Sequence, residues 1–155
     1  MKDRTREAIF DLLGPAIRDK HAVDLFAGTG ALGLEAISRG ALRATFLERH
    51  FPTAEVIRKN ANSLAIQQRC QVIASDTVFW ARQPLELGAG PWAVFCSPPY
   101  DLYVSQTADL VQLLSTLHSQ APSGSILIVE ADRRFDLEQL PEPLAWQVRH
   151  YPPAV

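Results

Sequence analysis

Residues 22–33 of the chain are Ala-Val-Asp-Leu-Phe-Ala-Gly-Thr-Gly-Ala-Leu-Gly, an apolar run that contains one acid and ends in glycines spaced G-x-G-x-x-G. Residues 23–26 predict a buried strand and residues 31–38 a helix, so the glycines fall in the turn between them. Glycine lets the backbone bend tightly there and approach a ligand. The stretch therefore predicts a loop that binds a nucleotide-type cofactor. A tight turn without a ligand and a dinucleotide site are the alternatives, because both use the same pattern.

A second apolar run, residues 94–100, is Val-Phe-Cys-Ser-Pro-Pro-Tyr. Nicotinamide enzymes have no use for this element, whereas enzymes that methylate an exocyclic or amide NH2 with S-adenosylmethionine carry [Asp/Asn/Ser]-Pro-Pro-[Tyr/Phe] at this place. Taken alone, the tetrapeptide is also compatible with a polyproline turn after a strand. Because it follows the glycine loop two or three strand-helix units later, the pair indicates an N-methyltransferase rather than a dinucleotide enzyme.

Length and composition predict one domain, residues 1–155. The chain is 47% hydrophobic and 21% charged, which suits a soluble domain with a sizeable core. It has no apolar segment long enough to span a membrane and no secretory signal at its polar start, so we expect a cytoplasmic monomer. Cys70 and Cys96 lack CxxC spacing and the four histidines are scattered, so we expect reduced thiols and no metal site.

The net charge of −2 gives the chain no general attraction to nucleic acid. Twelve of its fifteen basic residues are arginines, however, and six of these fall in the first third of the chain. Arginine suits phosphate because its donors form a planar fork. Arg4 and Arg6 are therefore candidates for contact with RNA. The alternative is a solvated helix face on which arginines mix with Asp and Glu.

The remainder of the chain alternates short apolar runs with helical patterns. We expect a first helix over residues 3–13, capped by Asp3. Strands are expected at 23–26, 44–48, 70–74, 92–96 and 125–130, and helices at 31–38, 52–64, 76–82 and 105–120. The alternation predicts an α/β fold with a mostly parallel central sheet flanked by helices. Together with the two motifs, it leads us to expect the Rossmann-like class I methyltransferase type.

Polar residues follow the predicted strands at the edge where such a sheet binds ligands. Glu48 is expected to accept both ribose hydroxyls of the cofactor, unless it caps the helix that opens near Pro52. Asp76 is expected to accept from the adenine amine, with Thr77 or Val78 beside the ring, unless Asp76 caps a short helix.

The glycine loop itself is expected to hold the methionine end of the cofactor. Gly28 and Gly30 would let backbone N–H groups approach the methionine carboxylate. Asp24 would receive the methionine ammonium, directly or through water.

The second motif offers the chemistry that an exocyclic amine needs. Its nitrogen lone pair is delocalised into the ring, and hydrogen bonds to Ser97 Oγ and the Pro98 carbonyl would favour a pyramidal nitrogen. Pro98 and Pro99 stiffen the loop, and Tyr100 offers a face on which a base can stack. Catalysis is then mostly positioning and electrostatics, with no metal and no covalent nucleophile.

Several segments together resemble the bacterial RsmD-type rRNA guanine-N2 methyltransferases. The resemblance rests on residues 4–10, 23–41, 46–48, Asn60, 97–100 and 128–130 and covers nearly the whole chain. It implies S-adenosylmethionine as cofactor and ribosomal RNA or a small-subunit particle as partner. It also implies that residues 97–100 receive the target base. The predicted cofactor-binding residues are Asp24, Phe26, Ala27, Gly28, Thr29, Gly30, Glu48, Asp76 and Thr77.

The chain departs from that family at Ser97, where the family usually has Asp. A neutral hydroxyl stabilises a developing ammonium less well than a carboxylate, by roughly 1–2 kcal/mol. The family also ordinarily has a basic hairpin before the first helix and a further strand after the point where this chain ends. Other readings are methylation of a DNA cytosine or a protein glutamine amide, and a weakly active cofactor-binding RNA or assembly factor.

Overall fold

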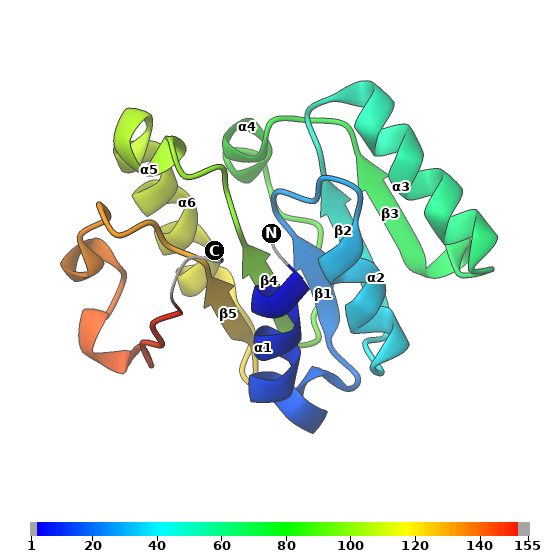
Figure 1. Cartoon of the computed structure of the whole chain (residues 1–155), viewed down its shortest axis with the longest axis horizontal. Coiled ribbons are helices and arrows are strands. Elements are labelled where there is room, and N and C mark those ends of the chain that lie inside the picture. The colour runs from blue at the N-terminus through cyan, green and yellow to red at the C-terminus, as the bar shows by residue number, and fades with distance from the viewer. Residues whose placement is uncertain (1–2, 152–155) are drawn as a thin grey trace.

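The computed structural model describes residues 3–151, whose five strands form one parallel sheet in the order β3-β2-β1-β4-β5 (Figure 1). The strands are β1 (His21–Asp24), β2 (Arg43–Leu47), β3 (Cys70–Ile73), β4 (Trp92–Cys96) and β5 (Ile126–Val129). The helices are α1 (Asp3–Leu13), α2 (Ala31–Ser38), α3 (Phe51–Ser63), α4 (Thr77–Ala81), α5 (Leu102–Ser105) and α6 (Thr107–Gln120). Short 3-10 turns lie at Gly14–Ile17, Gln67–Arg69, Leu137–Gln139 and Pro143–Ala145.

Helices cover both faces of the sheet, as the uninterrupted apolar strands predict. One face packs against α1, α2 and α3 through a core that includes Phe10, Phe46 and Phe95 (Figure 1). The other packs against α4, α5 and α6 and includes Leu47 and Val94. Neighbouring residues of one strand therefore enter opposite cores, which is the period of two that a strand dictates. The predicted α/β fold, with a parallel central sheet flanked by helices, is confirmed.

Most element bounds differ from the prediction by one or two residues, and two of the differences have identifiable reasons. Strand β1 ends at Asp24, although the buried Leu25 still donates its N–H to Phe95 O at 3.0 Å. The helix expected over residues 105–120 is interrupted at Gln106, whose backbone angles (φ −134°, ψ 40°) are not helical, so α5 and α6 are separate. Helix α1 starts at Asp3, whose carboxylate pairs with Arg6 at 3.2 Å within the helix.

The topology places the two sequence motifs side by side. The chain order reverses between β1 and β4, which are hydrogen-bonded neighbours in the middle of the sheet. Loops that leave two such strands diverge, and the crevice between them is where ligands bind in open α/β sheets. The glycine loop follows β1 and the Ser-Pro-Pro-Tyr segment follows β4. Among residues 3–151, no helix has the length and hydropathy needed to cross a bilayer.

Candidate cofactor and substrate site

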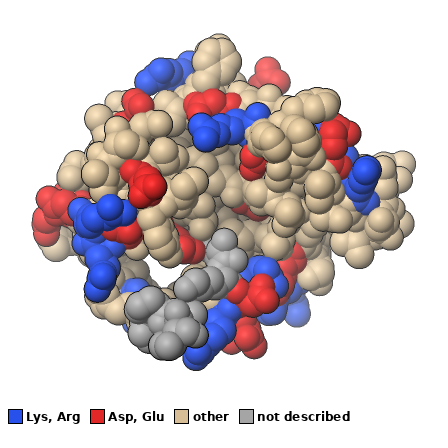
Figure 2. All heavy atoms as spheres, turned by 45° about the horizontal axis from the view of Figure 1, so that its top comes forward, with Lys and Arg blue, Asp and Glu red and all other residues tan. Residues whose placement is uncertain are grey.

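A cavity of about 2000 Å³ extends from the carboxyl ends of the strands along β5, and its lining also includes residues of α1 and of the segment that follows Pro143. It brings together predicted residues from four different loops. Its lining includes Phe26, Gly28, Glu48, Asp76, Thr77, Ser97, Pro98, Pro99 and Tyr100. Figure 2 shows Lys and Arg interspersed with Asp and Glu on the face that it presents, so the charge there is mixed. Both predicted motifs thus contribute to one site.

The first two glycines shape the loop. Gly28 (φ 56°) and Gly30 (φ 90°) lie in the left-handed region, which favours glycine. Their N–H groups are nevertheless already used, because Gly28 donates to Glu48 Oε2 at 2.9 Å and Gly30 donates to Ala27 O at 2.8 Å. Thr29 is also held, since Asn60 Nδ2 donates to its carbonyl at 3.2 Å. These two donors therefore bond within the protein, and the approach of backbone N–H groups of this loop to a methionine carboxylate stays a prediction.

The third glycine has another function. Gly33 lies in α2, and a Cβ atom there would come within 2.4 Å of Phe46 Cε1. Gly33 therefore lets α2, the helix that follows the glycine loop, pack closely on β2.

Glu48 ties the glycine loop to the segment that follows β2. Its Oε2 accepts from Gly28 N at 2.9 Å and its Oε1 accepts from His50 N at 3.0 Å. Helix α3 begins at Phe51, and His50 is the residue before it, so Glu48 does not cap the first turn of α3 as the alternative proposed. Each carboxylate oxygen can accept more than one hydrogen bond. Glu48 can therefore hold this loop and still accept hydroxyl groups from the cavity.

Asp24 lies beneath the glycine loop rather than in the lining of the cavity. It is 1% exposed, and its Oδ2 accepts from Gly33 N at 3.2 Å. Within the described part of the chain, its Oδ1 has no hydrogen-bond partner. Burial raises the pKa of Asp24 to about 7, and the nearby charge of Glu48 adds to this effect. An unpaired buried acceptor of this kind suits a cationic ligand.

We expect Asp24→Asn to change how stability depends on pH. Because the folded protein keeps Asp24 protonated up to about pH 7, while the unfolded chain ionises it near pH 3.8, wild type loses stability as pH rises between these values. Asparagine does not titrate. Unfolding by urea across this range should show the variant gaining on wild type as pH rises, with no further gain above about pH 7. The matched control is Asp11→Asn, because Asp11 is an exposed residue of α1. If the curves of stability against pH ran parallel for Asp24→Asn and wild type, Asp24 would not have the raised pKa of a buried carboxyl.

Asp76 and Thr77 both have structural partners at the start of α4. Asp76 Oδ1 accepts from Phe79 N at 2.9 Å, so the helix-cap alternative for Asp76 is confirmed. Asp76 also lines the cavity, and a cap does not prevent its carboxylate from meeting a ligand. The buried Thr77 hydroxyl donates to Leu25 O, which fixes α4 against the end of β1. Val78 lines the cavity beside them.

The Ser-Pro-Pro-Tyr segment is held by Glu130, to which the sequence analysis assigned no role. Ser97 Oγ donates to Glu130 Oε2 at 3.1 Å, and Tyr100 OH donates to Glu130 Oε1 at 2.5 Å. The second bond raises the pKa of Tyr100 to about 12. Pro98 is buried, whereas the Tyr100 side chain is 51% exposed.

The signal that could have found Glu130 is strand register. Cys96 pairs with Val129 in the parallel ladder, so the next residues along the two strands, Ser97 and Glu130, are neighbours at the same edge.

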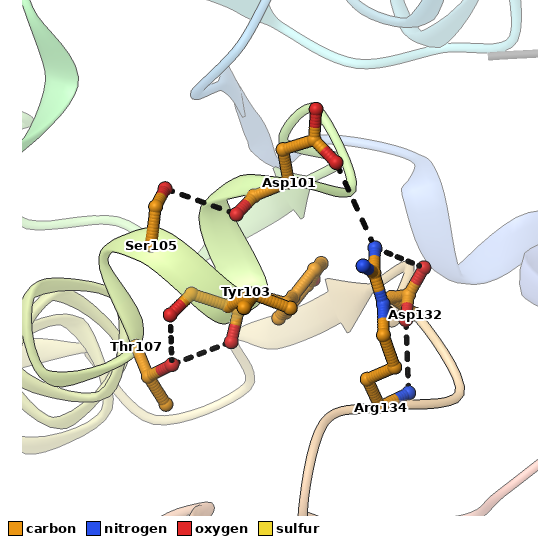
Figure 3. Close-up of polar contacts among 7 residues, drawn as sticks. Asp101, Tyr103, Ser105, Thr107, Asp132 and Arg134 are labelled. Carbon is orange, nitrogen blue, oxygen red and sulfur yellow. Dashed lines mark hydrogen bonds and ion pairs between the residues drawn. The ribbon is translucent and has the colours of Figure 1, made fainter.

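Beyond Tyr100 one exposed ion pair lies between the chain and the loop that follows β5. Figure 3 shows Arg134 between two acids, with Nε 2.7 Å from Asp132 Oδ1 and a guanidinium nitrogen 3.8 Å from Asp101 Oδ1. The hydrogen bonds from Arg134 lower the pKa of Asp132. Ser105 Oγ donates to Asp101 O at 3.0 Å in the same view. The pair of Asp101 and Arg134 thus brings the residue after the motif next to the β5 loop.

The two predicted RNA-binding arginines have different surroundings. Arg4 lines the cavity. Arg6 instead lies 3.2 Å from Asp3 and 3.6 Å from Glu35 of α2, so its charge is paired within the protein. The residues that the structure describes contain no cluster of three or more His, Cys, Asp or Glu that could hold a metal ion.

Comparison with known proteins agrees with this architecture. The family described as conserved hypothetical protein 95 matches residues 1–150. The Ribosomal RNA small subunit methyltransferase D of Haemophilus influenzae is 32% identical over 81% of this chain and 64% of its own length. The protein of the same name from Escherichia coli K12 is 38% identical over 63% of this chain and 48% of its own length. The chain thus spans about half to two thirds of these two relatives.

Solved structures share the fold. A conserved hypothetical protein from Streptococcus pyogenes superimposes with a TM-score of 0.75 at 25% identity, covering 95% of this chain and 89% of that one. An RNA methyltransferase from Salinibacter ruber in complex with S-adenosyl-L-homocysteine gives a TM-score of 0.56 at 13% identity, covering 73% and 69%. The second likeness concerns the fold alone. By sequence and by fold, the chain belongs to the conserved hypothetical protein 95 family, the family of the RsmD-type proteins that its motifs resemble.

Proposed function

We propose that this protein is an S-adenosylmethionine-dependent N-methyltransferase that acts on N2 of a guanine in small-subunit ribosomal RNA. The observation that carries the proposal is the single cavity lined by both the glycine loop and the Ser-Pro-Pro-Tyr segment. A cofactor loop alone would fit other reactions, but an amine-binding segment facing the same space fits transfer to an NH2 group. The names of the Haemophilus influenzae and Escherichia coli relatives support rRNA as the substrate.

The chain's polar groups fit this cofactor. Glu48 would accept the ribose hydroxyls and Asp76 the adenine amine, since both carboxylates line the cavity. Asp24 lies outside the lining, so its unpaired buried Oδ1 would accept from the methionine ammonium through a water molecule. Phe26 and Val78 offer apolar surface in the same lining. When bound, S-adenosylmethionine supplies an electrophilic methyl group whose transfer leaves the carbon–sulfur electron pair on sulfur.

The Ser-Pro-Pro-Tyr segment would hold the target. Ser97 Oγ and the Pro98 carbonyl would accept from the exocyclic NH2, which turns its lone pair out of conjugation with the ring. Tyr100, half exposed at the cavity, would stack on the base. The protein's contribution to the rate is then orientation and electrostatic stabilisation.

Cofactor choice tests the proposal without the RNA. Calorimetry should detect binding of S-adenosylmethionine and S-adenosylhomocysteine and no binding of NAD. All three ligands have a ribose and an adenine, so contacts to these groups do not distinguish them. Only S-adenosylmethionine and S-adenosylhomocysteine carry the methionine ammonium that Asp24 is proposed to bind. Binding of NAD without binding of the sulfonium cofactor would refute the methyltransferase assignment.

We expect Arg4→Ala to weaken RNA binding about three- to tenfold at low salt, because one exposed phosphate contact is worth on the order of 1 kcal/mol. Arg6→Ala is the matched control, and it should have the smaller effect because Arg6 is paired with Asp3 and Glu35. Filter binding with unmodified small-subunit rRNA at several salt concentrations measures both. Equal losses for the two variants, or a loss of cofactor binding in Arg4→Ala, would contradict this role for Arg4.

A further inference from the structure

Glu130 is the one acidic side chain that contacts both ends of the Ser-Pro-Pro-Tyr segment in the described structure. Its two carboxylate oxygens receive different donors, Ser97 Oγ at 3.1 Å and Tyr100 OH at 2.5 Å. Its backbone is fixed as well, because Glu130 N donates to Cys96 O at 2.9 Å and the Tyr103 hydroxyl donates to Glu130 O. Glu130 also lines the cavity. Glu130 therefore connects β5 to the groups that face the target.

This arrangement determines where the lone pairs of Ser97 point. A serine hydroxyl has one proton to donate and two lone pairs that accept. Since the proton is directed to Glu130, the lone pairs are left for donors in the cavity. Without a partner for that proton, the hydroxyl could rotate and present it to the cavity instead, where it would oppose an NH2 group.

We propose that Glu130 is a positioning residue for methyl transfer, which orients Ser97 and Tyr100 toward the target amine and takes up the amine's proton through Ser97. This inference rests on the proposed function, because it needs an NH2 group bound at Ser97. The Ser97 hydroxyl alone is neutral, but in contact with the Glu130 carboxylate it belongs to a pair that carries a negative charge. A charged acceptor strengthens hydrogen bonds to a group that becomes positive, and here that charge reaches the amine through one shared hydroxyl.

The proton transfer balances without any further reactant. The amine nitrogen, once its lone pair has bonded to the methyl carbon, is positively charged and must lose a proton. One N–H bond breaks, its electron pair returns to nitrogen, and the proton bonds to Ser97 Oγ. At the same time the original Ser97 O–H bond breaks and its proton bonds to Glu130 Oε2. The amine becomes neutral, Ser97 is again a hydroxyl, and Glu130 holds one proton that it later releases to water in the cavity.

The test is a double-variant cycle on methyl transfer from labelled S-adenosylmethionine to unmodified small-subunit particles. We expect Glu130→Gln to lower kcat about tenfold or more while the calorimetric Kd for the cofactor changes less than about twofold. Ser97→Ala should show a similar loss. The double variant should be no slower than the slower single variant, because Ser97 and Glu130 act together and either substitution removes their joint effect. The matched control is Glu138→Gln, an exposed glutamate outside the cavity lining, which should match wild type.

A readout independent of turnover follows Tyr100. The Glu130 hydrogen bond holds the Tyr100 phenol pKa at about 12, so its NMR signal, assigned with Tyr100→Phe, should not titrate below about pH 11 in wild type. In Glu130→Gln the midpoint should fall toward the ordinary tyrosine value of about 10. An unchanged Tyr100 titration would overturn the proposal, because Glu130 would then not hold the ring in solution.

The remaining outcomes distinguish the role of Glu130 from the proposed methyltransferase function. If wild type transfers methyl groups and Glu130→Gln is equally fast, or if its loss multiplies with that of Ser97→Ala, the role of Glu130 is refuted and the proposed function stands. If wild type transfers nothing to particles or to free RNA, the proposed function fails and this role fails with it.

Discussion

Glu48→Ala is expected to weaken S-adenosylmethionine binding by about 10- to 100-fold, corresponding to roughly 1–3 kcal/mol. Two effects add in the same direction. The variant removes the acceptor proposed for the ribose hydroxyls, and it also releases the N–H groups of Gly28 and His50 that the carboxylate holds. The glycine loop would therefore lose its fixed position as well as a ligand contact. Calorimetry with the cofactor and with its demethylated product measures the loss.

The control for this variant is Glu55→Ala. Glu55 lies on α3, close to Glu48 in sequence, but its carboxylate pairs with Arg58 and it is outside the lining of the cavity. We expect its cofactor affinity to equal that of wild type. A Glu48→Ala protein that melts like wild type and binds the cofactor equally well would show that Glu48 neither binds ribose nor orders the loop.

Gly33→Ala is expected to destabilise the protein by about 2 kcal/mol. A Cβ at this position would lie 2.4 Å from Phe46 Cε1 and 2.8 Å from Phe46 Cζ. Phe46 is 0% exposed, so its ring or α2 would have to shift within the core, and overpacking of this kind costs up to roughly 3 kcal/mol. The helix gains about 1 kcal/mol from replacing glycine, which offsets only part of that cost. Thermal unfolding should show a melting temperature about 4–8 °C lower.

Gly90→Ala is the matched control, because nothing lies within 4 Å of a Cβ built there and its backbone is not in the left-handed region. We expect its stability to stay within about 0.5 kcal/mol of wild type. If Gly33→Ala were as stable as Gly90→Ala, the close packing of α2 on Phe46 would be wrong.

The fold could be predicted well because buried parallel strands have a strong sequence signal. Strand β4 was predicted with its observed bounds, Trp92–Cys96, since Gly-Pro precedes it and Ser-Pro-Pro follows. The end of β1 was placed two residues late, because burial of Leu25 continues past the last strand residue. Apolar pattern reports burial, and burial does not stop where the sheet pairing stops. The break at Gln106 likewise leaves the apolar pattern of the helix intact.

The site was predictable as a set of loops and less so as a set of hydrogen bonds. Residue types at strand ends placed Glu48, Asp76 and Ser97 around one space, and all three line the cavity. The glycine spacing did not show that the N–H groups of Gly28 and Gly30 form hydrogen bonds within the protein, because these bonds depend on the backbone conformation of the turn.

The partners from distant segments were also missed. Asn60 and Glu130 hold the two motifs from α3 and from the end of β5. Both belong to segments that resemble the family, but their contacts depend on how α3 packs and on the register of β5 with β4. The spacing of residues within a motif predicts neither the packing of α3 nor the register of β5 with β4.

The most direct test of the central claim is to map the methyl group that the protein transfers. Wild-type protein would be incubated with labelled S-adenosylmethionine and unmodified small-subunit rRNA, both protein-free and within small-subunit particles, and the labelled nucleotide identified by digestion and mass spectrometry. We predict label on N2 of a guanine. Label on a cytosine N4 or on a protein glutamine instead, or no transfer to either form of the RNA by a protein that binds the cofactor, would contradict it.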